Sequence, residues 1–264
     1  MPNEGTGFLP RILTIAKNAF REAVRDRILY NLILFVLLIT ASAIFLGELT
    51  AGQESRVIVN LGLSSILLFG AFISIFVGVS LVWKEIEKRT VYSIFSKPIG
   101  RGEFIVGKYI GLCSTLLVNI LVMGAGVSFA LLYVGGGPLV WKIWGAVTLI
   151  FFELTIITAV AIMFSSFSTP ALSALLTFFV FLIGHFSSSL LDLATSLGSK
   201  GAIWFFSAIY YLLPNLSNFS FIANTANGDT PPLAMVGGAI MYAVVFDIVL
   251  MAITVMIFSR RNFK

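Results

Sequence analysis

Residues able to do chemistry are few in this sequence and lie far apart. The chain has one histidine, His185, and one cysteine, Cys113, and two such residues are too few for a metal site built from His and Cys ligands. Ser187, Ser188 and Ser189 follow His185, but neighbours this close on one helix do not all converge, and no third group is evident to orient the histidine. His185 is therefore interpreted as a satisfied polar residue that faces a helical bundle.

Two sequence patterns for hydrolysis are also missing. The sequence contains neither the G-x-S-x-G elbow of serine hydrolases nor the G-x-x-x-x-G-K-[ST] loop that binds the phosphates of ATP. We therefore expect no catalytic residue, no metal site and no cofactor in this chain. An intramembrane enzyme is the function class that this absence disfavours.

Two acidic residues, Glu153 and Asp247, fall inside long apolar runs. A charged carboxylate at the centre of a membrane costs about 3 kcal/mol on insertion scales, so such residues usually face a bundle interior or a water-filled path. One hypothesis is that they line or gate a translocation route. The other is that each forms a hydrogen-bonded lock between helices, and the sequence leaves both open.

The largest polar stretch, residues 83–108, separates two long apolar runs and is called here the polar segment. It holds six of the seventeen basic residues and three of the twelve acidic ones. Glu85 precedes Lys88 and Arg89 by three and four residues, an order that stabilises a helix. We expect a helix from Lys84 to about Phe95. Because charges fill the first half of this helix and an aromatic and aliphatic tip fills its second half, it is typical of a protein-contact surface. The alternative is a solvated loop that lies on lipid headgroups.

The rest of the chain is too apolar for a soluble domain. Hydrophobic residues make up 58% of it, charged residues 11%, and the mean hydropathy is +1.01, whereas soluble domains carry about 25% charged residues. A membrane crossing needs about 20 apolar residues. The sequence therefore predicts an all-α integral membrane protein of one domain, residues 1–264, with six transmembrane helices at about 28–48, 60–83, 104–134, 143–167, 170–191 and 234–258. The third is long enough to tilt or to project from the membrane.

The distribution of basic residues predicts the orientation. Fourteen of the seventeen lie in the N-terminal segment, the polar segment and the C-terminal tail, and three, Arg56, Lys142 and Lys200, lie in the other connections. The positive-inside rule then places both termini in the cytoplasm, which agrees with an even number of spans. We expect a multi-pass protein of the inner (plasma) membrane, and we expect no nucleic-acid partner for its net charge of +5.

Two further segments are expected at the membrane interface. Residues 8–27 place apolar side chains on one helical face and basic ones on the other, which predicts an interfacial elbow helix; the alternative is a soluble amphipathic helix. Residues 192–233 are rich in aromatic residues and poor in charge, which predicts an outer re-entrant or interfacial segment at headgroup level.

Small residues recur every four positions in two of the predicted spans. Gly70, Ser74 and Gly78 lie in one, and Gly107 and Gly111 lie in the next. This spacing lets helix backbones approach closely in lipid. It predicts close packing, either within the chain or between two copies.

The polar segment resembles a known family. Its E-x-E-x-x-T run, made by Glu85, Glu87 and Thr90, and its later residues resemble the cytoplasmic loop of ABC-2 type transporter permeases, especially those grouped with the nitrous-oxide-reductase maturation transporter. The later matching residues are Pro98, Arg101, Glu103, Gly107 and Lys108. The resemblance covers most of the chain, including the elbow helix, the six spans and the bulky segment before the last span.

This resemblance implies a permease without its own ATPase. Two permease chains would pair, as a homodimer in our expectation although a heterodimer stays open, and a separate ABC ATPase subunit would bind ATP and Mg. Residues 84–103 would form the coupling loop, whose helix enters a cleft of that ATPase. The residues expected at this contact are Glu85, Glu87, Thr90, Tyr92, Phe95, Pro98, Arg101 and Lys108.

The expected function is ATP-driven movement of a substrate across the inner membrane, with the substrate itself left open. The alternative keeps the same fold but relays the ATPase cycle to a periplasmic or other extracytoplasmic protein, without substrate flux.

Overall fold

The computed structural model describes residues 8–25, 27–48, 50, 52–87, 100–187, 189, 196 and 200–260, and these residues fold into helices joined by short connections. The long elements are α1 (Phe8–Val24), α2 (Arg27–Glu48), α3 (Glu54–Glu87), α5 (Arg101–Tyr133), α6 (Gly137–Ser165), α7 (Pro170–His185) and α11 (Leu233–Arg260). The shorter ones are α9 (Lys200–Leu212), the 3₁₀ helix η1 (Leu216–Phe219) and α10 (Ile222–Ala226).

Four helices are long and apolar enough to cross a membrane in the part of the chain that is described: α3, α5, α6 and α11. They contain or nearly coincide with four of the predicted spans. The predicted spans 28–48 and 170–191 correspond to α2, which has 22 residues, and α7, which has 16. Helix α7 is shorter than the roughly 20 residues a crossing needs, and in α2 the apolar stretch found among the described residues is Val36–Gly47. The all-α, multi-pass architecture is thus confirmed, and the count of six spans stays a prediction.

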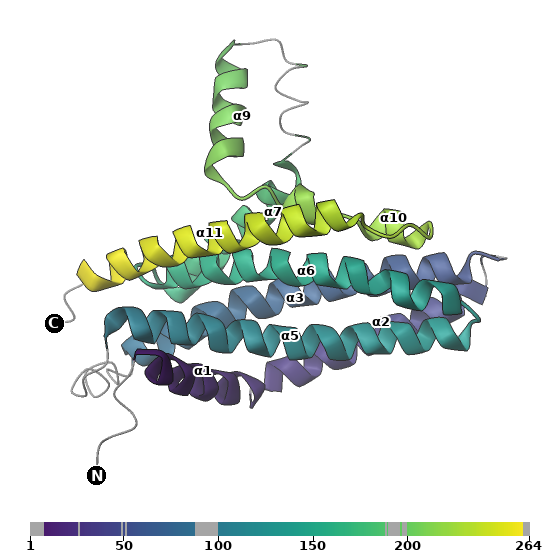
Figure 1. The fold of residues 1–264 in the computed structure, drawn as a ribbon, viewed down its shortest axis with the longest axis horizontal. Helices are drawn as coiled ribbons and strands as arrows, with labels where there is room; N and C mark the ends of the chain where they lie inside the picture. Colours follow the sequence, from purple (N-terminus) through teal and green to yellow (C-terminus); the bar gives the residue numbers. More distant parts are fainter. Residues whose placement is uncertain are drawn as a thin grey trace.

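The long helices form one bundle (Figure 1). Helix α1 runs in the same direction as α2, and from α2 onward successive long helices run in opposite directions. The end of α3, the start of α5, the start of α1 and the end of α11 all lie at the same end of this bundle, which is called here the α3–α5 end. A polar segment and two termini on one side of a membrane require this arrangement. Which side that is stays a prediction.

The centre of the bundle is built from α3 and α6. α3 packs against α2, α5, α6 and α7, and α6 packs against α3, α5, α7 and α11. Because neighbours surround these two helices, apolar side chains on more than one face of each are fully buried. Examples are Ile66 and Ile73 of α3 and Leu154 of α6. By contrast, α11 lies on the outside of the bundle and leaves Val245 and Ile248 more than half exposed.

The small residues of α3 bring it close to α6 within the same chain. A Cβ atom added to Gly78 would lie 3.0 Å from the Cβ of Ala161, and one added to Gly70 would collide with Leu154. The Ser165 hydroxyl, at the end of α6, donates to the carbonyl oxygen of Val79 at 2.9 Å. The predicted close packing of this span therefore occurs inside the chain.

A helix, α1, covers most of the residues predicted to form the elbow helix, and it packs along α5; its place at the membrane interface stays a prediction. Ile12, Ala16 and Ala19 are buried. Leu9 and Leu13 belong to the same predicted apolar face, yet they are 70% and 63% exposed. The apolar stripe is thus wider than the contact with α5, and its uncovered part is available to lipid, as the interfacial prediction requires.

The predicted outer segment, residues 192–233, divides into two parts. η1 and α10 pack on α6, with α10 also on α3 and η1 on α7. Helix α10 lies toward the end of the bundle opposite the α3–α5 end (Figure 1). α9 instead projects sideways from the bundle (Figure 1), with Trp204 and Tyr211 largely exposed. Only the first part covers the bundle.

Candidate functional site

The predicted coupling residues gather at the α3–α5 end, as far as the structure describes them. Glu85 and Glu87 belong to the last turn of α3, and Arg101 begins α5. Lys108 lies two turns further along α5. The predicted contact residues Thr90, Tyr92, Phe95 and Pro98 lie outside the described residues.

The start of α5 is held by polar contacts on three sides. The Gly100 N–H donates to Glu103 Oε2 at 2.8 Å, which satisfies a backbone donor that the helix start leaves free. The other carboxylate oxygen of Glu103 lies 3.7 Å from Arg11 Nη1 of α1. Arg101 Nη1 donates to the carbonyl oxygen of Ser259, near the end of α11, at 2.6 Å. Helix α5 therefore leaves the polar segment already tied to α1 and α11.

Lys108 provides the second link between α5 and α1. Its Nζ atom lies 3.2 Å from Glu22 Oε2, and its side chain is only 5% exposed, whereas that of Glu22 is 46% exposed. The same ammonium group lies 5.8 Å from the centre of the Phe104 ring. The resemblance suggested Lys108 as a residue that contacts the ATPase. Its burial against α1 favours a role in positioning α5.

The Lys108–Glu22 pair leads to a first prediction. Replacing Glu22 by glutamine removes the carboxylate that lies 3.2 Å from this nearly buried ammonium group. We expect the chain to lose about 1 kcal/mol of stability, a modest cost because Glu22 is half exposed. Lys108→Met should lower the stability less than Glu22→Gln does, because the methionine side chain still packs on Phe104. Thermal unfolding of the detergent-solubilised chain measures both, and Lys17→Met on the exposed face of α1 is the control. Equal costs for Glu22→Gln and Lys108→Met would contradict the expected asymmetry.

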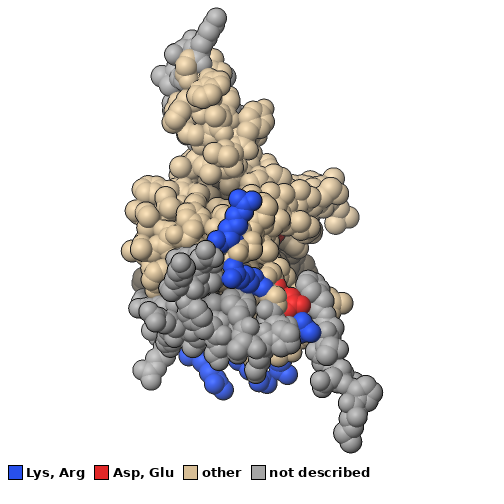
Figure 2. Space-filling view, turned by 90° about the vertical axis from the view of Figure 1, so that its left-hand side faces the viewer, with Lys and Arg blue, Asp and Glu red and all other residues tan. Residues whose placement is uncertain are grey.

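Positive charge marks the α3–α5 end of the molecule. Figure 2 views this end, and Lys and Arg side chains gather on it with few acidic ones between them. Arg11 and Arg101 contact Glu103 and Ser259 at this end, and Arg260 is the last residue of α11 there. Such a surface suits the cytoplasmic face of a membrane protein, where basic residues concentrate.

Glu153 and His185 form a pair inside the bundle. His185 Nδ1 lies 3.3 Å from Glu153 Oε1, so the last residue of α7 is joined to the middle of α6. The Glu153 side chain is 1% exposed, and its Oε2 atom has no hydrogen-bond partner among the described residues. His185 is thus a partnered polar residue of the bundle, as interpreted above. Sequence reasoning did not identify Glu153 as its partner, because the two residues lie on different helices.

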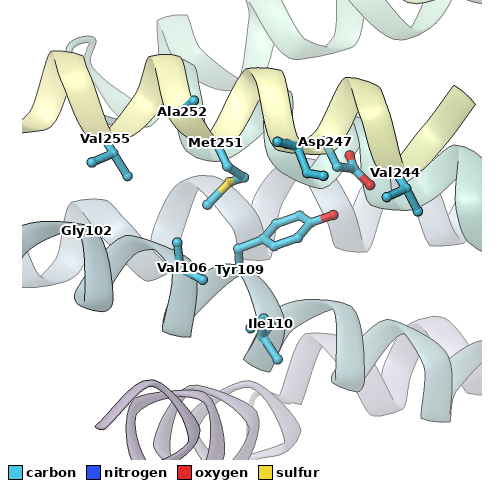
Figure 3. A pocket seen from close by; sticks show the side chains of 10 residues that line it. Gly102, Val106, Tyr109, Ile110, Val244, Asp247, Met251, Ala252 and Val255 are labelled. Atoms are coloured by element: carbon cyan, nitrogen blue, oxygen red, sulfur yellow. The ribbon is translucent and has the colours of Figure 1, made fainter. Parts of the chain in front are cut away.

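Asp247 lies on α11 beside a groove between this helix and α5. The groove has a volume of about 690 Å³. Tyr109 of α5 and Thr155 of α6 supply the polar groups that face the Asp247 carboxyl group, and Figure 3 shows the Tyr109 hydroxyl directed toward it. The two acidic residues do not contact each other: Glu153 contacts His185, and Asp247 faces Tyr109 and Thr155. The two intramembrane carboxyl groups therefore have separate surroundings.

Comparisons with known proteins place this arrangement in context. A family model described as ABC-2 family transporter protein matches residues 13–262, nearly the whole chain. A curated relative, the probable ABC transporter permease protein NosY of Pseudomonas aeruginosa, is 25% identical over 107 residues. That match spans 39% of this chain and 39% of the relative.

Proposed function

The chain belongs to the ABC-2 family of transporter proteins, and on that premise we propose that it is the permease subunit that moves a substrate across the inner membrane. The resemblance noted in the polar segment is confirmed at the level of this family. Membership implies an ABC ATPase as partner. In the proposal, that separate subunit binds ATP and Mg, and two permease chains pair to form the pathway.

The observation that carries this proposal is the family match over residues 13–262, which includes the polar segment and both helices that flank it. The ends of α3 and α5 lie together at a basic end of the bundle. An ATPase seated on residues 84–103 would pull on both helices at once. Since α5 is tied to α1 and α11 through Arg11, Arg101 and Lys108, a displacement of the polar segment would move these helices as one unit.

A second prediction tests the docking surface. Replacing Tyr92 and Phe95 by alanine is expected to weaken binding of the ATPase subunit by about 30-fold, because aromatic anchors at interface centres contribute about 2 kcal/mol or more. Co-purification of the subunit from co-expressing cells, followed by titration, measures this. The matched control replaces Phe129 and Tyr211, two exposed aromatic residues far from the polar segment.

Charge reversals within the polar segment complete this test. Glu85→Lys and Arg89→Glu should each weaken binding of the ATPase subunit relative to the wild-type chain and make that binding depend more strongly on salt. Undiminished ATPase binding by the alanine variant and by both charge reversals would show that this segment is not the docking surface.

A third prediction concerns orientation. A fluorescent-protein fusion after Lys264 should fluoresce, because it folds in the cytoplasm, and an alkaline-phosphatase fusion after Gly135 should be active, because it lies outside. Gly135 joins α5 to α6 at the end of the bundle opposite the α3–α5 end. A phosphatase that is inactive after Gly135 and active after Lys264 would reverse the proposed topology.

The alternative function, mechanical relay to an extracytoplasmic protein, is favoured by one feature. α9 projects from the bundle and exposes aromatic side chains, with Trp204 75% and Tyr211 83% exposed. If α9 holds such a partner, serine at both positions should release that partner while the ATPase still co-purifies. Under the transport proposal, the same variant should keep ATP-driven flux once its substrate is known.

A further inference from the structure

Three basic residues form a row on the exposed side of α1, and this row is called here the basic ladder. Lys17, Arg21 and Arg25 are spaced four positions apart, so each lies about 6 Å from the next along the helix axis, on the same side of the helix. Arg25 follows the last residue of α1, but its N–H still donates to the Arg21 carbonyl oxygen at 3.3 Å, which continues the helical turn. All three residues are exposed. Figure 2 shows basic side chains, and no acidic ones, at the lower edge of the molecule, the side on which Figure 1 draws α1.

The charge of the basic ladder is not balanced by the described residues around it. Glu22 is the only acidic residue of α1, and its Oε2 atom lies 3.2 Å from Lys108 Nζ of α5. No ladder residue forms an ion pair with a described acidic residue. Asp26 follows the ladder in the sequence, but Arg27 follows Asp26, so residues 17–27 hold four basic and two acidic side chains. Like charges four positions apart on a helix repel one another, and an anion that bridges them relieves this repulsion.

The position of the basic ladder in the chain brings it to the membrane surface. Helix α2, which corresponds to the first predicted span, begins at Arg27, two residues after Arg25. Tyr30 and Leu34, in the first turns of α2, are 59% and 56% exposed. An exposed tyrosine at the start of a span is typical of the headgroup level, and exposed leucine beyond it is typical of contact with acyl chains. The ladder is therefore expected beside lipid headgroups, whose phosphate groups carry negative charge.

The row that contains the basic ladder continues toward the start of α1 with two exposed leucines, Leu13 and Leu9. Exposed apolar residues and basic residues together on one helix are typical of a helix that lies in the membrane interface. None of the five side chains in this row is acidic or accepts a hydrogen bond. A partner for the row therefore has to supply both apolar contact and anionic oxygen atoms, and an anionic phospholipid supplies both.

We propose that the basic ladder binds the phosphate groups of anionic phospholipids. Arg21 and Arg25 each offer a planar fork of N–H donors that matches phosphate oxygen atoms, and Lys17 adds a third positive charge. The acyl chains lie against the exposed apolar side chains at the start of α2. A zwitterionic phospholipid carries its own positive charge next to the phosphate, so the unbalanced ladder favours a headgroup with a net negative charge. The site does not depend on the proposed transport function or on which side of the membrane holds the α3–α5 end.

Native mass spectrometry of the full-length chain in detergent tests the lipid preference. Phosphatidylglycerol is the anionic probe, and phosphatidylcholine with the same acyl chains is the zwitterionic one. We expect the wild-type chain to bind phosphatidylglycerol more than about tenfold more tightly than phosphatidylcholine. Arg21→Gln should lower the affinity for phosphatidylglycerol about fivefold, since one basic residue at an anionic membrane surface contributes about 1 kcal/mol. Glutamine at all three ladder positions should abolish the preference.

Two further variants are the controls. Arg21→Lys keeps the positive charge and should retain most of the preference. Arg56→Gln removes one charge from an exposed position of α3, outside the ladder, and phosphatidylglycerol binding should stay at the wild-type level. The ladder side chains are exposed, so thermal unfolding of their variants without added lipid should match that of the wild-type chain.

Photo-crosslinking in lipid nanodiscs locates the contact. Phosphatidylglycerol with a diazirine in its headgroup should label the peptide of the full-length chain that holds residues 17–30, as mapped by mass spectrometry. Glutamine at all three ladder positions should reduce this labelling to the level given by phosphatidylcholine with the same headgroup label.

Four results would overturn the proposal. Equal binding of the two lipids by the wild-type chain, or an undiminished preference with glutamine at all three positions, would show that the ladder does not select lipid headgroups. Displacement of phosphatidylglycerol by an equal concentration of inorganic phosphate would show that the ladder binds a free anion. Loss of the crosslinks to α1 when the ATPase subunit is bound would show that protein covers the ladder.

Discussion

Replacing Gly111 by valine is expected to separate α1 from α5 and to cost about 3 kcal/mol or more, at or beyond the upper end of what overpacking typically costs. A Cβ atom at Gly111 would lie 2.5 Å from the carbonyl oxygen of Ala16 and 2.6 Å from the Cβ of Ala19. Neither atom belongs to a flexible side chain, so the crowding cannot be relieved by a rotamer change. The backbone of α1 has to move, and the two ion pairs between α1 and α5 are then stretched.

The expected result is measured by trypsin cleavage of the purified chain. Lys17 and Arg21 of α1 are exposed, yet a docked helix resists the protease, so faster cleavage after these residues reports release of α1. Gly111→Ala should give an intermediate rate. The matched control is Gly237→Val in α11, where an added Cβ atom meets nothing within 4 Å. Equal cleavage rates for Gly111→Val and Gly237→Val would contradict the close approach.

The same variant connects the fold to the proposed function. α1 contacts α5 next to the point where α5 leaves the polar segment, and the Arg11–Glu103 and Lys108–Glu22 contacts lie there. A displaced α1 removes these supports from the start of α5. We therefore expect Gly111→Val to lower the ATPase rate of the assembled complex even if the ATPase subunit still binds.

Sequence reasoning located the helices well because hydrophobic length and turn residues determine them. The predicted span 28–48 is α2, which runs from Arg27 to Glu48, and the long third span is α5, whose 33 residues extend about 50 Å. The spacing of Gly107 and Gly111 likewise predicted a close helix contact. The spacing did not identify α1 as the neighbour of α5. Small residues show that another helix can approach closely, but they do not show which helix it is.

The faces of α1 illustrate a second limit. Periodicity assigned Leu9, Ile12 and Ala16 to one apolar face, and the structure divides that face between α5 and the outside. A stripe repeating every 3.6 residues is broad enough to meet both a neighbouring helix and lipid. Only the position of α5 decides which residues belong to which contact.

The candidate sites divide in the same way. Glu153 and Asp247 were identified because ionisable residues stand out in apolar runs, but their partners were not, since His185 is 32 positions away from Glu153 and Tyr109 lies on another helix than Asp247. The contact residues of the polar segment rest on the family resemblance. Arg101 and Lys108 are the described members of that set with resolved side-chain contacts, and both point toward neighbouring helices of the same chain.

Replacing His185 by alanine should be among the most destabilising changes inside the bundle. Glu153 is almost completely buried, with its Oε1 atom 3.3 Å from His185 Nδ1 and its Oε2 atom unpartnered among the described residues. Without His185, the carboxyl group loses the one side-chain partner that the structure gives it. Removing one member of a fully buried pair typically costs about 3–5 kcal/mol, and because the His185 side chain is 30% exposed, we expect a loss of about 2–3 kcal/mol. Unfolding in detergent micelles measures the loss.

A double-mutant cycle separates this effect from a simple loss of packing. Glu153→Gln keeps a hydrogen-bonding group beside His185 and should cost less than about 1 kcal/mol, the net worth of an ordinary hydrogen bond. The double variant should therefore be more stable than His185→Ala alone, since no buried carboxyl group remains to be satisfied. If the two single effects simply add, His185 acts through its bulk, and the pair does not hold α7 to α6.

The same variants distinguish a lock from a pathway residue. If Glu153 holds α6 to α7, the ATPase rate of the assembled complex should follow stability, so Glu153→Gln stays near the wild-type rate while His185→Ala falls. If the carboxylate itself takes part in translocation, Glu153→Gln should lose ATP-driven activity although the chain is as stable as before. The contacts favour the lock, because α7 ends at His185 and this side chain is what joins its last turn to the centre of the bundle.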